Sequence, residues 1–318
     1  MMQLFLIGVS AGAATALLFA SVSSGSALAI PLFYLAPLPI LIAALGWSHW
    51  AGLIAAIVAS ASLAAAFGPY AFFAFLLGAG LPAWWLAYLA LLARPVATAP
   101  DGLEWYPVGH LVVWAAILSG LIVIGEILNI GTTEDSFRAE TAKGLERVLR
   151  IEAGDSEPGL SRQVLALLTT IIPMVAGILT TLTAVMSVAL AARIVKVSGR
   201  LRRPWPRLSA MTFPPYAPLL TAVTVVGFFL PGMPGIASSV LMASLLTAYA
   251  ILGLAVLHAI TRGTRARPFT LGSAYASVLL IGWPALALVA LGLADTAFDL
   301  RGRVARRRGP PNLPHPGT

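Results

Sequence analysis

The chain of 318 residues is 59% hydrophobic and 10% charged, whereas a soluble domain is about one quarter charged, so a soluble globular fold is excluded. It contains no cysteine, which excludes disulfides, thiolate metal sites and iron–sulfur clusters. The net charge of +8 comes mainly from arginines beside apolar segments, and this pattern indicates contact with anionic lipid head groups and no nucleic-acid partner.

The first 93 residues contain no Asp, Glu, Lys or Arg, and a transmembrane helix needs about 20 apolar residues. This stretch predicts four transmembrane helices, at 3–24, 28–46, 49–67 and 70–93. We expect the first to remain a transmembrane helix and not to be cleaved as a signal peptide, because no basic residue precedes it. It carries small-xxx-small patterns, including Ala16 and Ala20, that allow close helix approach. These alanines are candidates for partner docking, and ordinary packing within the chain is the alternative.

Prolines interrupt the second and fourth predicted helices, where Pro37, Pro39 and Pro82 each remove a backbone donor. In a membrane, such breaks persist where neighbouring helices or a cavity satisfy the freed carbonyls. The pattern therefore predicts that these two helices line a cavity, with a packed kink as the alternative.

A fifth helix is predicted over 107–128, after a polar loop at 94–106. Glu126 and Asn129 lie on one face near its end, and no basic residue lies within ten positions of Glu126. An intramembrane carboxyl is costly, so these two residues are candidates for ligand binding or proton coupling. Alternatively, Glu126 lies at the helix end among the lipid head groups.

The segment 133–153 predicts an amphipathic surface helix, capped by Thr132 or Thr133. Its apolar face comprises Phe137, Thr141, Leu145, Val148 and Leu149, and Glu146 is spaced to pair with Arg150. A sixth transmembrane helix is predicted over 163–192 with a bend at Pro173.

The densest basic stretch of the chain follows at 193–207. It marks the cytoplasmic side by the positive-inside rule, and Arg200, Arg202 and Arg203 within it are candidates for partner docking.

The C-terminal third predicts a half-span at 216–231, full spans at 235–260 and 271–294, and a basic, Pro-rich tail at 295–318 that is disordered at its end. Three basic clusters flank these segments and cannot all face one side if every segment spans. A half-span that returns to its own side gives eight spans, and the alternative is nine. We therefore predict an all-α polytopic bundle, one membrane domain over 1–294, with about eight or nine spans and one surface helix.

No catalytic or metal-binding motif is present: the sequence has no HExxH, no P-loop and no Gly-x-Ser-x-Gly. Asp295 and Asp299 are spaced as a carboxylate pair, but Arg303 follows four residues later and favours local ion pairing. We therefore expect neither an enzyme nor a cofactor or metal.

The runs Leu35–Ile40, Ala44–Leu53, Trp105–Gly109 and Arg203–Pro206 resemble the YybS-like predicted membrane proteins, in particular their alphaproteobacterial branch, as do the residues around Asp295 and Asp299. That uncharacterised bacterial family is distantly similar to the S components of energy-coupling-factor vitamin transporters. The resemblance implies a docking contact of the Ala16 and Ala20 type, and a coupling subunit and ATPase as partners. S components are much shorter, so no ligand residue is carried over.

Two functions are consistent with the sequence of this bacterial inner-membrane protein. The first is transport-type small-molecule binding in a cavity near Glu126, in which case Glu126→Gln abolishes binding or uptake. The second is a scaffold or assembly factor that acts through the basic loop 193–207, in which case the Glu126 change is silent.

Overall fold

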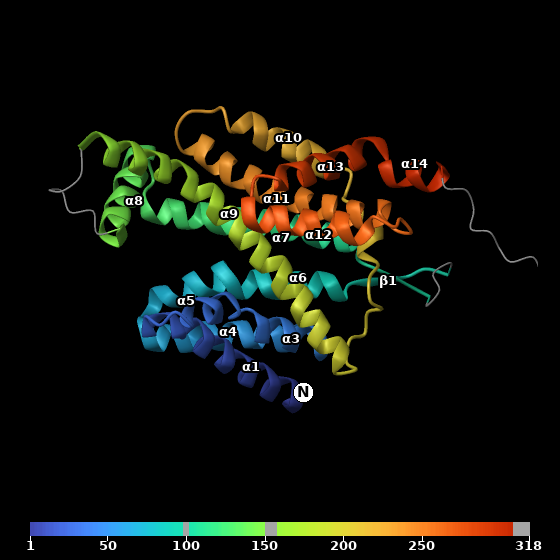
Figure 1. Cartoon of the computed structure of the whole chain (residues 1–318). Helices are drawn as coiled ribbons and strands as arrows, with labels where there is room; N and C mark the ends of the chain where they lie inside the picture. Colours follow the sequence, from blue (N-terminus) through green and yellow to red (C-terminus); the bar gives the residue numbers. More distant parts are fainter. Residues whose placement is uncertain (98–101, 150–157, 308–318) are drawn as a thin grey trace, which may run out of the picture.

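The computed structural model describes residues 1–97, 102–149 and 158–307, and these form an all-α bundle with one small β-hairpin (Figure 1). Seven helical segments are long and apolar enough to cross a membrane, and shorter apolar helices accompany them. The predicted all-α polytopic fold is confirmed. The seven segments are Met2–Ser24, Ala29–Gly46, His49–Phe67, Pro69–Leu91, Val108–Ile130, Gln163–Val197 and Met233–Ile260.

The prolines and glycines of the N-terminal region divide two of the predicted spans. The second span consists of two helices joined at Leu35–Pro37, and the fourth contains a π-helical turn at Leu76–Gly80, which holds Gly78 and Gly80. The elements of this region are α1 (Met2–Ala20), α2 (Ala29–Tyr34), α3 (Leu38–Gly46), α4 (His49–Phe67), α5 (Pro69–Phe75) and α6 (Leu81–Leu91).

The small residues of α1 pack against α4. A Cβ atom at Gly8 would overlap Ile54, and one at Gly12 would overlap the Ala55 carbonyl and Val58. Ala16 is buried in the same core and Ala20 is half-buried beside it. This close approach gives the small-xxx-small pattern a role in packing within the chain.

A β-hairpin links the N-terminal helices to the central ones. Strands β1 (Ala93–Pro95) and β2 (Leu103–Trp105) pair antiparallel, and Arg94 forms an ion pair with Glu104 at 2.6 Å. Helix α7 (Val108–Ile130) follows, and then the predicted surface helix, α8 (Glu134–Leu149).

Helix α8 lies on the bundle, against α7 and α9 (Pro158–Val197). Thr133 caps it, because its hydroxyl accepts the Ser136 amide at 3.2 Å. Phe137 anchors the helix, since it is 2% exposed in a core with residues of α7 and α11 (Met233–Ile260). The side chains of Val148, Leu149 and Arg150 lie outside the described residues.

The C-terminal helices correct two predictions. The expected span 271–294 is broken at Gly282, whose φ is 81°, just before Pro284. Residues 295–298 and 300–307 are helical, so this part of the predicted tail belongs to helices; 308–318 lie outside the described residues. The helices are α10 (Ala217–Gly227), α11 (Met233–Ile260), α12 (Arg267–Ile281), α13 (Ala285–Phe298) and α14 (Leu300–Arg307).

Most basic side chains gather at one end of the bundle, which we name the basic end. It comprises the turn at Trp47, the β-hairpin, the loop 198–216, the loop 261–266 and α14 (Figure 1). Hydrogen bonds connect these parts, because the loop 198–216 contacts the Trp47 carbonyl, Arg262 and Arg301. The opposite end carries the turn at Gly68, helix α8 and residues 228–232.

All three C-terminal basic clusters therefore lie at one end, an arrangement that the prediction had excluded only if every segment spans the membrane. The segment 216–231 does not return to its own side: α10 starts at the basic end, and residues 228–232 lie beside α8 and the start of α11. Helices α12 and α13 then lead away from the basic end and back (Figure 1). At 15 and 14 residues and about 1.5 Å per residue, each is shorter than the hydrocarbon core.

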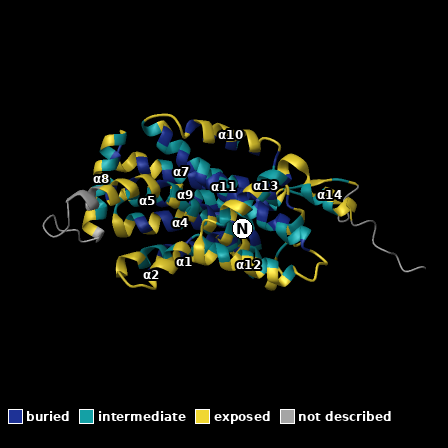
Figure 2. Cartoon of the chain, turned by 45° about the horizontal axis from the view of Figure 1, so that its top comes forward, coloured by how far each residue is buried: buried dark blue, intermediate teal, exposed yellow. Residues whose placement is uncertain are grey.

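Burial is greatest in the centre of the bundle and low in α12. Figure 2 shows buried residues along α7 and α11 and exposed ones on the outer helices. No residue of α12 is buried, and its contacts with the other helices are sparse.

Candidate ligand cavity at the basic end

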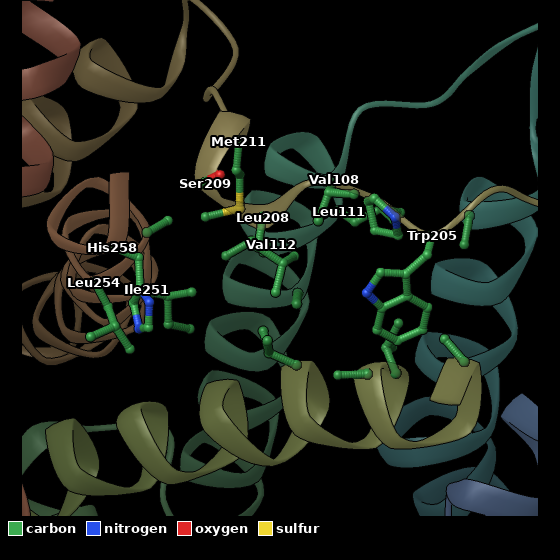
Figure 3. A pocket seen from close by; sticks show the side chains of 18 of the residues that line it. Val108, Leu111, Val112, Trp205, Leu208, Ser209, Met211, Ile251, Leu254 and His258 are labelled. Carbon is green, nitrogen blue, oxygen red and sulfur yellow. The ribbon is translucent and has the colours of Figure 1, made fainter. Parts of the chain in front are cut away.

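A cavity with a volume of about 530 Å³ lies at the basic end, and this volume is within the size range of small-molecule sites. Helices α7, α9 and α11 form its walls, and the loop 201–211 closes it (Figure 3). The walls are apolar, with side chains that include Val108, Leu111, Val112, Val185, Val188, Ile251 and Leu254.

Apolar residues within the basic loop complete the cavity. Trp205 interrupts the run of arginines, Leu208 and Met211 follow it, and all three face the walls (Figure 3). The Trp205 ring lies over α9, where the Lys196 ammonium is 4.6 Å from the ring centroid. The loop therefore folds back onto the bundle as a cover.

The three arginines predicted to dock a partner hold this loop to the chain itself. Arg200 stacks on the Trp47 ring at 4.6 Å, and Arg202 donates to the Trp47 carbonyl at 3.3 Å. Arg203 donates to the Ala90 carbonyl at 3.3 Å and also lines the cavity. Arg202 remains exposed, whereas Arg203 is half-buried.

Several polar side chains also line the cavity. Arg203, Arg262 and Arg267 line it, and Arg262 donates to the Ser209 hydroxyl at 2.9 Å. The His258 ring nitrogen Nε2 and the Tyr275 hydroxyl lie 3.0 Å apart, which joins α11 to α12. Burial lowers the pKa of Arg203, because desolvation disfavours its charged form.

A buried ion pair fixes the cover from the C-terminal side. Two guanidinium nitrogens of Arg301 bind Asp295, at 2.7 and 3.0 Å, and a third donates to the Ser209 carbonyl at 3.0 Å. Asp299 pairs instead with Arg306 at 3.5 Å. Local ion pairing of the two aspartates was expected here. Their partners are Arg301 and Arg306, whereas Arg303 lies over the Phe298 ring.

Two of the predicted cavity prolines meet in a smaller cavity of about 80 Å³, lined by Pro37 and Pro82 but not by Pro39. Hydroxyl groups of Ser119, Thr180, Thr183 and Ser187 also line it. This cavity and the larger one share Leu86, Ala115 and Val188, so the two are neighbours along α9.

Glu126 and Asn129 lie apart from both cavities. Each is exposed near the end of α7 that is remote from the basic end. The Asn129 amide donates to the Tyr70 hydroxyl at 2.8 Å, which ties α7 to the start of α5. The structure does not bring Glu126 together with Pro37 or Pro82.

Sequence reasoning did not single out Trp205, Arg262, Arg267 or Tyr275 as site residues. The sequence did contain one signal of this site, the large apolar residues Trp205, Leu208 and Met211 in the basic loop. In a loop surrounded by water such side chains would be exposed, so they indicate that the loop packs on the bundle. Among the described residues, no group of three or more His, Asp or Glu could hold a metal ion.

The fold and the cavity define a polytopic α-helical membrane protein with an apolar cavity beneath an arginine-rich loop. The family described as "Predicted membrane protein (DUF2232)" matches residues 13–296, and the chain belongs to this family. Neither a curated protein nor a solved structure matches the chain.

Proposed function

We propose that this protein is a transport-type component of the bacterial inner membrane that binds a small molecule in the cavity at the basic end. The observation that carries the proposal is the cavity of about 530 Å³ with apolar walls and three arginines in its lining, since a tightly packed structural bundle leaves few voids larger than a water molecule. The proposed role is binding and movement of the ligand without catalysis.

The basic end faces the cytoplasm in this proposal, because loops rich in Lys and Arg stay on that side. The arginines and lysines at the basic end far outnumber those at the opposite end, where the ones with described side chains are Arg138, Lys143 and Arg147. An energy source reaches the protein either through a coupling subunit and ATPase, as for the S components that the sequence resembles, or through a proton gradient.

A scaffold that acts through the basic loop is the second candidate. The observation in its favour is that Arg202 and Arg207 remain exposed on the loop. Against it, Arg200, Arg202 and Arg203 all contact the bundle, so a part of the loop's charge serves contacts within the chain.

Filling the cavity tests the proposed function. The experiment is purification of the tagged full-length chain in mild detergent, with mass spectrometry of the small molecules and proteins that co-purify. We expect the wild type to retain a stoichiometric small molecule and Ala189→Trp to lose it, because Ala189 lines the cavity. Leu190→Trp is the matched control, since Leu190 is the next residue of α9 and points away, 41% exposed. A ligand retained equally by both variants, or absent from the wild type, contradicts the proposal.

The Glu126→Gln variant separates binding from energy coupling. Glu126 lies exposed and outside the cavity, so we expect this variant to retain the small molecule as well as the wild type does. The second measurement is uptake of the same small molecule by cells that carry the variant. If the variant binds the molecule but does not take it up, Glu126 is assigned to proton coupling. If the variant does not bind the molecule, the cavity is not the binding site.

A further inference from the structure

We infer that the ligand is a membrane-borne amphiphile with an apolar chain and a phosphate-type anionic head group, an inference that rests on the proposed function. The cavity has two chemically different parts. Its walls are aliphatic side chains from three helices, whereas Arg203, Arg262, Arg267, His258 and Tyr275 supply its polar groups. A wholly apolar ligand would leave the polar groups unused, and a small polar ligand would leave the walls unused.

The charge of the arginines that line the cavity favours an anionic ligand. Arg203 is half-buried, and the contact of its guanidinium with the Ala90 carbonyl supplies no negative charge. Within the described ranges, no carboxylate lies at ion-pairing distance from Arg203 or Arg267. A cation removed from water without a counter-charge is costly, so an anionic head group would stabilise this arrangement.

The chemistry of the donors favours a phosphate. A guanidinium presents a planar fork of donors that matches phosphate oxygens in pairs. A phosphate monoester also carries more than one negative charge near neutral pH, which suits a site with three arginines and a neighbouring His258–Tyr275 pair better than one carboxylate does.

The position of α12 points to the bilayer as the source. The loop 201–211 covers the cavity at the basic end, where it would meet water (Figure 3). On the lipid side, α12 contributes Arg267 and Tyr275, although none of its residues is buried and its packing on other helices is sparse. Gly263 and Gly282, at φ of 79° and 81°, flank this helix. A lightly held helix between cavity and lipid allows an amphiphile to enter from the membrane.

The test compares two probes that share one oleoyl chain and a glycerol unit. Lysophosphatidic acid carries a phosphate, and monoolein does not. The full-length protein in a non-ionic detergent is titrated with each probe, and binding is measured by native mass spectrometry. We expect saturable one-to-one binding of lysophosphatidic acid and at least about tenfold weaker binding of monoolein, because monoolein offers the arginines no charged acceptor.

Two variants and one control assign the head group to the arginines. Arg203→Ala and Arg267→Ala are each expected to weaken lysophosphatidic acid binding about tenfold and to leave monoolein binding unchanged. Arg207→Ala removes the same charge from the same loop but lies outside the cavity, so its affinity should stay within about twofold of the wild type. The thermal midpoint of each variant shows whether it is folded. If Arg203→Ala does not fold, Arg267→Ala alone tests the contact with the head group.

Three results would overturn the inference. Equal affinity for both probes would exclude a role for the phosphate. Competition by glycerol 3-phosphate as strong as that by lysophosphatidic acid would identify a water-borne ligand. Binding of neither probe, by protein that still retains a co-purified molecule sensitive to Ala189→Trp, would reject the amphiphile and leave the proposed function standing. Absence of any cavity ligand would instead reject both.

Discussion

Asp295→Asn is expected to reduce the free energy of unfolding by about 3 kcal/mol, the lower end of what breaking a buried ion pair costs. The side chains of Asp295 and Arg301 are only 5% and 16% exposed. Asp295 accepts two bonds from the Arg301 guanidinium and one from the Arg301 amide. Without the carboxylate charge, the guanidinium stays buried and uncompensated, and this is the source of the loss.

The same change should loosen the cover of the cavity. Arg301 connects Asp295 to the Ser209 carbonyl, and Arg262 donates to the Ser209 hydroxyl. Ser209 thus joins the loop that lines the cavity to the loop 261–266 and to α14. We expect hydrogen exchange of the amides at 205–211 to rise in the variant before the helices unfold.

The measurement is the thermal midpoint of the purified chain, with Asp299→Asn as the control. Asp299 also pairs with an arginine, but both partners are more than two thirds exposed and 3.5 Å apart, so its loss should cost less than about 1 kcal/mol. Asparagine tolerates the left-handed backbone of this residue, whose φ is 47°. Equal effects of the two changes would mean that the buried pair contributes no more to the free energy of unfolding than the exposed pair does.

Local signals in the sequence predicted most of the elements. The length of the apolar segments predicted the spans, and the pattern of Thr133 and Phe137 predicted helix α8. The prolines predicted the breaks at Leu35–Pro37 and beside Leu76–Gly80. Each of these depends on residues close together in the chain. Hydropathy missed the break at Gly282, because Trp283 and its neighbours keep the window apolar while the glycine adopts a positive φ.

The cavity and the side of each loop could not be predicted in the same way. The basic clusters share one end because α10 carries the chain to the opposite end, although its 11 residues are too few for a span by length alone. The cavity forms where α7, α9 and α11 meet the loop 201–211. Arg203 and Arg267 are 64 positions apart in the sequence, and no local pattern relates them.

The second large effect is expected for the contact between α11 and α13. Gly253 faces the main chain of α13, so that an added Cβ would overlap the Leu288 carbonyl, and Gly292 faces the Tyr249 carbonyl in return. No rotamer change relieves an overlap with backbone atoms, so the helices must move apart. We expect Gly253→Ala to lower the free energy of unfolding by about 3 kcal/mol, the upper part of the usual range for overpacking.

Gly125→Ala is the control with the opposite expected sign. Gly125 lies inside α7, where an added Cβ would meet open space, and alanine in a helix interior is favoured over glycine by about 0.5–1 kcal/mol. The added methyl group should therefore stabilise α7 in Gly125→Ala and destabilise the α11–α13 contact in Gly253→Ala. The difference appears directly in the thermal midpoints of the two variants. Separation of α13 would also displace Asp295 and hence the cover of the cavity. A Gly253→Ala protein as stable as the wild type would contradict the close packing of these helices.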